Sequence, residues 1–160
     1  MKDAYINGKI IDGTKEMQVK KGYAILVEQG KIKNIVLQEE ADLTGYNVVN
    51  LKGNYIMPGL INMHVHLAGN GKPQKKQRDN AKLVNFLMSN PLTRAIAHNM
   101  VSGFAEMELL SGVTTIRTVG GIRDFDTRVR DEINCGKKRG PRILAGNEAF
   151  QSLMVIWQGV

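Results

Sequence analysis

The 160-residue chain has a single cysteine, Cys135, and aromatic side chains make up only 6% of it. One cysteine cannot form a disulfide within the chain, which excludes a disulfide-stapled scaffold and favours a reducing compartment. The N-terminus lacks the apolar core of a signal peptide, and no stretch approaches the ~20 consecutive apolar residues that a membrane-spanning helix needs. These absences predict a cytoplasmic protein without a membrane partner.

Acidic residues are fewer than basic ones, and the formal net charge of +7 would suit a nucleic-acid binder. The basic residues are scattered over positions 20–21, 72–82 and 137–139. No aromatic residues alternate with them as stacking platforms for bases. We therefore predict a solvated basic surface and no nucleic-acid partner, with a salt-sensitive nucleic-acid binder as the less favoured alternative.

Residues 54–67 contain a nearly continuous apolar run that ends in two histidines. Such a run is typical of a parallel strand that is buried on both faces, and Pro58-Gly59 marks its entry. His64 and His66 are two positions apart, so in a strand they project to the same side. Because neutral imidazole is the commonest metal ligand, the pair is a candidate metal site. A histidine pair without a role is the alternative reading of this spacing.

Residues 1–57 read as short strands separated by turns. The dipeptide Asn7-Gly8 lies between two apolar segments and predicts a β-hairpin. Further strands are predicted over 23–28, after a turn at 29–31, and over 48–51.

The next regular segment is a helix that begins at Asn90-Pro91 and stops at Gly112. Large apolar residues recur in it at three- and four-residue intervals, which predicts an inward-facing stripe of Ile96, Met100, Phe104, Met107 and Leu110. His98 lies off this stripe, so we expect a surface or second-layer residue and not a metal ligand.

The last segments alternate between strand and helix. A strand is predicted over 112–121 and a helix over 124–135 with Val129 and Ile133 facing inward, and residues 136–145 are predicted to lead into a third strand. Cys135 is expected to be a small buried apolar residue. Strand and helix alternation is typical of an α/β protein with a parallel sheet.

The run from Met57 to His66, Met-Pro-Gly-Leu-Ile-Asn-Met-His-Val-His, resembles the first barrel strand of the amidohydrolase superfamily. The resemblance continues through 112–121 and 136–145 and is closest to the imidazolonepropionase-like and Xaa-Pro dipeptidase-like branch. It implies part of a small β-sandwich in 1–57, then the first three βα units of a (β/α)8 barrel in 58–149. A complete barrel needs about 250 residues, so this chain holds an incomplete, N-terminal fragment. Its open strand edges predict aggregation.

The resemblance also implies a function. Amidohydrolases hydrolyse amide, peptide or cyclic amide C–N bonds with a metal-activated water, using one or two divalent ions, usually Zn²⁺. His64 and His66 would be the first two ligands, and the substrate would be a small-molecule amide or dipeptide. The family's lysine, its two further histidines and its aspartate have no counterpart here. We therefore predict no catalytic residue in this chain and no activity, with a non-catalytic assembly or binding module as the alternative.

Other positions relate less directly to the family pattern. Thr118 stands where the family usually has aspartate. The loop 69–78 follows the histidine strand at the end where barrel active sites are built, and we expect a solvated loop, with a contact to a substrate carboxylate as the alternative. Substrate-binding residues remain unknown from the sequence, and a homo-oligomer is compatible with it.

The resemblance ends near Asn147. With permitted synonymous codons, a shifted frame from about Phe150 encodes Ile-Ser-Val-Thr-Asp-Gly-His, similar to the run that the family has at this point. We therefore predict that 150–160 is an out-of-frame tail, which the underlying DNA would test. A native apolar end that packs through Val155, Ile156 and Trp157 is the alternative.

Overall fold

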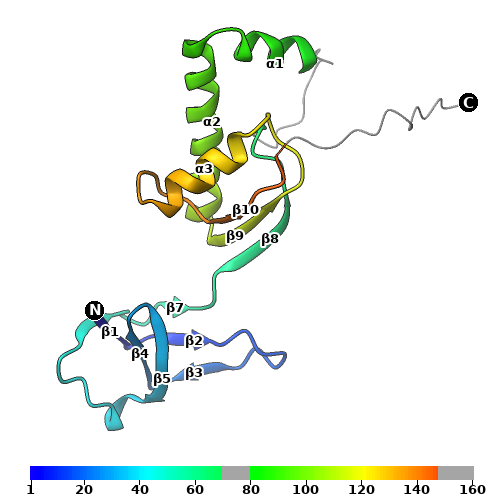
Figure 1. Cartoon of the computed structure of the whole chain (residues 1–160). Helices are drawn as coiled ribbons and strands as arrows, with labels where there is room; N and C mark the ends of the chain where they lie inside the picture. Colours follow the sequence, from blue (N-terminus) through cyan, green and yellow to red (C-terminus); the bar gives the residue numbers. More distant parts are fainter. Residues whose placement is uncertain (70–79, 148–160) are drawn as a thin grey trace, which may run out of the picture. The chain divides into compact units, whose positions relative to one another are not determined.

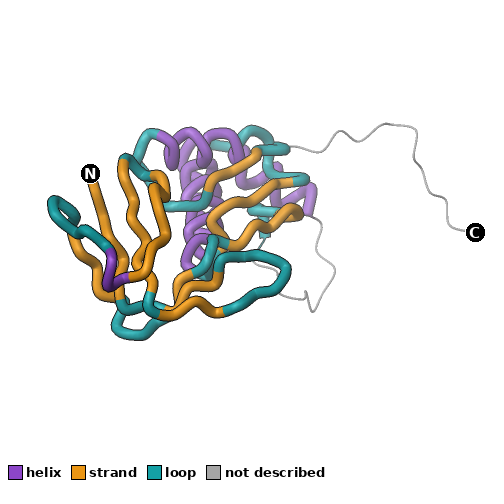
Figure 2. The backbone as a smooth tube through the Cα atoms, turned by 90° about the horizontal axis from the view of Figure 1, so that it is seen from below, coloured by secondary structure: helices purple, strands orange, loops and turns teal. Residues whose placement is uncertain are grey.

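The computed structural model describes residues 1–69 and 80–147 (Figure 1). The chain divides between Pro58 and Gly59 into two compact units. The first contains strands and one short 3₁₀ helix, and the second combines strands with helices (Figure 2). The predictions for most of the loop 69–78 and for the tail 150–160 lie outside the described residues.

The first unit holds two small sheets. In the four-stranded sheet the order is β5-β4-β1-β6, and in the three-stranded sheet it is β3-β2-β7. The strands of the first sheet are β1 (Lys2–Ile6), β4 (Tyr23–Glu28), β5 (Lys31–Leu37) and β6 (Asn47–Asn50). Those of the second are β2 (Lys9–Ile11), β3 (Val19–Lys21) and β7 (Tyr55–Ile56), and a 3₁₀ helix spans Gln38–Glu40.

The predicted hairpin at Asn7-Gly8 is wrong. β1 pairs with β4 and β6, whereas β2 pairs with β3 and β7, so the chain passes from one sheet to the other at this dipeptide. The Gln38 side chain accepts a hydrogen bond from Asn7 N at 2.8 Å and donates one to Asn7 Oδ1 at 2.9 Å. These bonds hold Asn7 at φ 55°, where it redirects the chain without closing a hairpin.

The second unit is built on a parallel three-stranded sheet in the order β10-β9-β8. Its strands are β8 (Leu60–Val65), β9 (Val113–Thr118) and β10 (Arg142–Leu144). Its helices are α1 (Asn80–Met88), α2 (Pro91–Leu110) and α3 (Phe125–Asn134), of which α1 was not predicted. The predicted α/β class is therefore confirmed. α2 packs against β9 and α3 against β10, around a core that includes Ile116, Phe125 and Val129.

The ends of α2 follow the prediction, but its inner face does not. The Asn90 side chain accepts a hydrogen bond from Thr93 N at 3.0 Å and caps the helix. The buried side chains are the smaller ones of Ala97, Val101, Ser102 and Ala105. Of the predicted stripe only Phe104 packs against the core, and the exposed members are Ile96, Met100, Met107 and Leu110. Small residues allow α2 to approach the sheet closely, and the larger ones lie outside.

Two further burial predictions are wrong. β8 is paired only with β9 in the described structure, and Leu60, Ile61 and Met63 are at least half exposed, so this strand is not buried on both faces. Cys135 is also exposed, because it follows the end of α3, where its thiol lies 3.4 Å from the Glu132 carbonyl oxygen.

Across residues 1–69 and 80–147, no helix has both the length and the apolar character that crossing a bilayer requires.

Candidate metal centre

The end of β8 brings the two predicted ligands together. His64 Nε2 and His66 Nε2 lie 3.3 Å apart, and both side chains are exposed. A tetrahedral zinc ion that binds two nitrogens at ~2.0–2.1 Å keeps those nitrogens ~3.3–3.4 Å apart. The two Nε2 atoms are therefore separated by the distance that a shared metal ion requires.

An irregularity in β8 contributes to this arrangement. Asn62 is opposite Ile116 and Val65 is opposite Thr118, so β8 carries one residue more than β9 between the two pairs. The Asn62 side chain accepts the His64 N–H at 3.2 Å. Such bulges re-aim side chains and are common beside active sites. Sequence spacing predicted that the histidines share a side, but it gave no sign of the bulge.

A backbone carbonyl fixes which His66 nitrogen is free. His66 Nδ1 lies 3.0 Å from the Gly120 carbonyl oxygen, which can only accept a hydrogen bond. In the neutral ring the proton is therefore on Nδ1, and Nε2 presents its lone pair. Metal-ligating histidines commonly donate their second N–H to a carbonyl in this way. Without metal, His64 Nε2–H can donate to His66 Nε2, and a bound ion would displace that proton.

The pair borders a hollow of about 600 Å³ between β8 and the C-terminal half of α2. Its lining is partly apolar and includes one carboxylate: Asn62, His64, Val65, His66, Gly69, Phe104, Met107, Glu108 and Ser111. Among the described residues, no three His, Cys, Asp or Glu side chains are grouped so that they could hold a metal. A catalytic zinc site has three protein ligands. The donors present fit two of those ligands and do not make a complete site.

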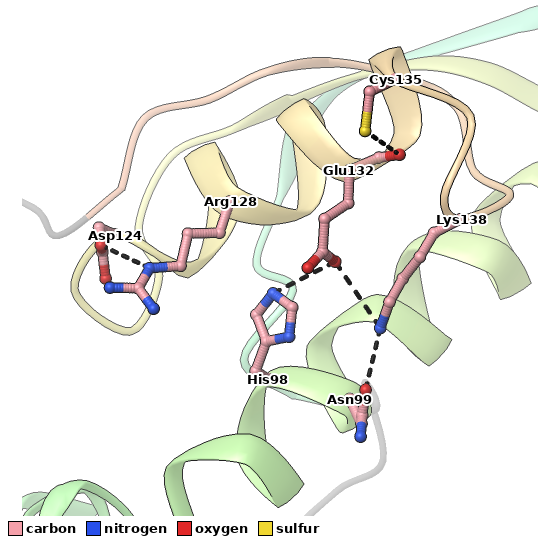
Figure 3. A network of polar contacts seen from close by, with 7 residues as sticks. All are labelled: His98, Asn99, Asp124, Arg128, Glu132, Cys135 and Lys138. Atoms are coloured by element: carbon pink, nitrogen blue, oxygen red, sulfur yellow. Dashed lines mark hydrogen bonds and ion pairs between the residues drawn. The ribbon is translucent and has the colours of Figure 1, made fainter. Parts of the chain in front are cut away.

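The third histidine of the sequence is engaged elsewhere (Figure 3). His98 Nε2 on α2 lies 3.5 Å from Glu132 Oε2 on α3, a polar contact that is too long for a good hydrogen bond. Lys138 Nζ is 3.7 Å from the same oxygen, and the His98 ring packs edge-on against Phe125. His98 therefore lies in the helix layer, as expected, and joins α2 to α3.

The same figure shows an ion pair at the start of α3. Arg128 Nε donates to Asp124 Oδ2 at 2.7 Å, and this hydrogen bond lowers the pKa of the Asp124 carboxyl group. Both side chains are 54% exposed, so the pair contributes little to stability.

Two polar residues beside the pair were not predicted to have a role. Thr118, in the position of the family's usual aspartate, is 2% exposed and accepts the Gly146 N–H at 2.7 Å through its hydroxyl. Asn147 accepts the Gly121 N–H at 2.7 Å through its backbone carbonyl. In the sequence, the double glycine at 120–121 predicted that the strand ends here. It did not predict that the turn contacts His66 and Asn147.

No protein-family model matches the chain. It is 34% identical over 68 residues to a 5-methylthioadenosine/S-adenosylhomocysteine deaminase of Bacillus thuringiensis (strain Al Hakam), covering 42% of this chain and 16% of that protein. It is 37% identical over 73 residues to a dihydroorotase of Aquifex aeolicus (strain VF5), covering 44% and 16%. The chain thus spans about a sixth of the curated relatives that it matches.

The fold resembles that of a solved Xaa-Pro dipeptidase with methionine bound in its active site. The TM-score is 0.68 at 27% identity, over 91% of this chain and 33% of that one. The α/β structure therefore matches an amidohydrolase N-terminal region. Relatives and structural neighbours together support the predicted resemblance of this chain to the amidohydrolase superfamily.

Proposed function

We propose that this chain supplies the first two metal ligands, His64 and His66, of a metal-dependent hydrolase that cleaves a C–N bond in a small amide, dipeptide or cyclic amide. The observation that carries the proposal is the 3.3 Å separation of the two Nε2 atoms, with the His66 tautomer fixed by the Gly120 carbonyl. The similarity to a deaminase, a dihydroorotase and a dipeptidase supports a C–N bond as the target.

The fold supports the same proposal. In a (β/α)8 barrel, active-site residues lie at the C-terminal ends of parallel strands, and the two histidines lie at the end of β8. We infer that β8, β9 and β10 are the first three barrel strands and that residues 1–57 are part of the accompanying sandwich. The proposed metal is a divalent ion, with zinc as the first choice. When bound, it would lower the pKa of a coordinated water to about 7.

These residues alone are not expected to catalyse hydrolysis. His64 and His66 can hold and orient an ion, but the sequence contains only one other histidine, and that residue contacts Glu132. The exposed hollow beside the pair does not exclude water. Turnover therefore requires further ligands and a proton-transfer group that the described residues do not bring to the site.

We expect weak metal binding that depends on both histidines. Titration of the 160-residue chain with Co²⁺, followed by absorption, should show one weak site. His64→Ala and His66→Ala should each reduce its affinity on the order of tenfold or more, because one remaining imidazole cannot chelate. His98→Ala is the matched control and should bind Co²⁺ as the unmodified chain does. Equal affinities in the unmodified chain and the His64→Ala/His66→Ala variant would refute the proposed site.

We expect no hydrolysis by the zinc-saturated chain. An Xaa-Pro dipeptide, an N-acyl amino acid and a cyclic imide should each be hydrolysed no faster than in zinc solution without protein, measured by chromatography of the products. A rate that exceeds this blank and disappears in His64→Ala would contradict the predicted inactivity, while supporting the metal site.

A further inference from the structure

One peptide group beside the histidine pair is held at both of its polar atoms. The Gly120 carbonyl oxygen accepts the His66 Nδ1–H at 3.0 Å. The N–H of the same peptide group, which belongs to Gly121, donates to the Asn147 carbonyl oxygen at 2.7 Å. Because the peptide group is planar, the direction of its N–H sets the direction of its carbonyl. The position of Asn147 therefore determines where the acceptor for His66 lies.

Asn147 is itself fixed by α3. Its Oδ1 accepts from Thr127 N at 3.1 Å, and its amide also lies within hydrogen-bond distance of the Thr127 hydroxyl. Thr127 is in the first turn of α3, where backbone N–H groups have no partner within the helix. Asn147 has φ 51°, a left-handed conformation that asparagine adopts more readily than most residues. Both residues are half-buried, which shields these bonds from solvent.

We propose that Asn147 is a positioning residue for His66. Its side chain anchors it to Thr127, its carbonyl orients the Gly120–Gly121 peptide group, and that group keeps the His66 proton on Nδ1. His66 Nε2 is then free to bind a metal ion. This inference rests on the proposed function, because it assigns a purpose to the free Nε2. Aligned hydrogen bonds of this kind also polarise one another, which strengthens the contact with His66.

Three variants separate this role from general stability. Asn147→Gly removes the side chain and tolerates the positive φ. Asn147→Asp keeps the oxygen that accepts from Thr127 N, so it should still position the His66 ring. Asn99→Ala is the control, since it removes an asparagine whose Oδ1 accepts from Lys138 Nζ at 2.9 Å in the helix layer.

The first readout is the His66 tautomer in the metal-free chain. Long-range ¹H–¹⁵N spectra of ¹⁵N-histidine-labelled protein are recorded at mildly alkaline pH, and they show which ring nitrogen carries the proton. We expect Nδ1–H in the unmodified chain, in Asn147→Asp and in Asn99→Ala, and a mixture of tautomers in Asn147→Gly. A His66 signal that is the same in Asn147→Gly and in the unmodified chain would overturn the inference.

The second readout is Co²⁺ affinity, which should fall about tenfold in Asn147→Gly and recover in Asn147→Asp. A tautomer that depends on Asn147 in a chain that binds no Co²⁺ would refute the metal site and support the positioning of the ring. If His98 signals show that Asn147→Gly is unfolded, Thr127→Val replaces it. That variant keeps the Thr127 N–H and should shift the His66 tautomer partly, and an unchanged tautomer would overturn the inference.

Discussion

Ala97→Glu is expected to unfold the second unit, whereas Ile96→Glu, at the neighbouring position, is expected to leave its stability almost unchanged. Ala97 is fully buried on the inner face of α2, and Ile96 on the same helix is 56% exposed. A glutamate at 97 must bury a carboxylate without a partner, at a cost of several kcal/mol, a large part of the ~5–15 kcal/mol that stabilises a typical domain. At 96 the same side chain lies in water and is a good helix former.

Urea unfolding followed by far-ultraviolet circular dichroism measures both effects. The adjacent positions share a helix and receive the same charge, so any difference between the variants reports which face of α2 is inside. Comparable destabilisation by the two substitutions would show that the inner face has been assigned wrongly.

The ends of α2 could be predicted from sequence because local residues determine them. Asn90 caps the first turn through its own side chain, and Gly112 adopts φ 92° just beyond the helix. The face of α2 could not be predicted in this way. Periodicity identified the large apolar side chains, but the sheet is approached by Ala97, Val101 and Ala105, whose small size weakens the pattern. Close packing against β9 decided between the two faces, and that contact is not visible in the sequence of α2 alone.

Strand pairing in the first unit illustrates the same limit. The strand over 23–28 and its turn at Gln29-Gly30 were predicted correctly, since both turn residues adopt positive φ and β4 pairs with the next strand. Asn7-Gly8 also adopts a turn conformation at Asn7, yet it joins strands of different sheets. The deciding partner is Gln38, which is 31 positions away.

At the candidate site, the spacing of His64 and His66 was sufficient to predict that their rings lie together. The groups that orient them were not predictable, because they come from distant parts of the chain. The Gly120 carbonyl is 54 positions from His66, and Asn147 reaches that carbonyl only through a peptide group of the turn after β9. The sequence therefore predicted the histidine pair as candidate ligands, and the tertiary structure was needed to find what fixes the His66 tautomer.

Gly121→Ala is expected to destabilise the second unit by about 2–3 kcal/mol, the upper part of the usual range for overpacking. A Cβ atom on Gly121 would lie 2.6 Å from Oδ1 and 2.8 Å from Cγ of Asp126. Asp126 is 1% exposed, and neither of its carboxylate oxygens has a hydrogen-bond partner among the residues described. The carboxylate has little room to move aside, so the added methyl group must displace the turn that holds the Gly120 carbonyl against His66.

A double-mutant cycle tests this cause. Asp126→Ala removes the atoms that a Cβ at position 121 would meet, so Gly121→Ala should cost at least about 1 kcal/mol less in that background than in the unmodified chain. Gly103→Ala is the matched control, because a Cβ there meets nothing within 4 Å and alanine is the better helix former, so it should stabilise α2 by about 0.5–1 kcal/mol. Urea unfolding of the four chains gives the coupling. Strictly additive effects of Gly121→Ala and Asp126→Ala would show that the carboxylate is not what excludes a side chain at 121.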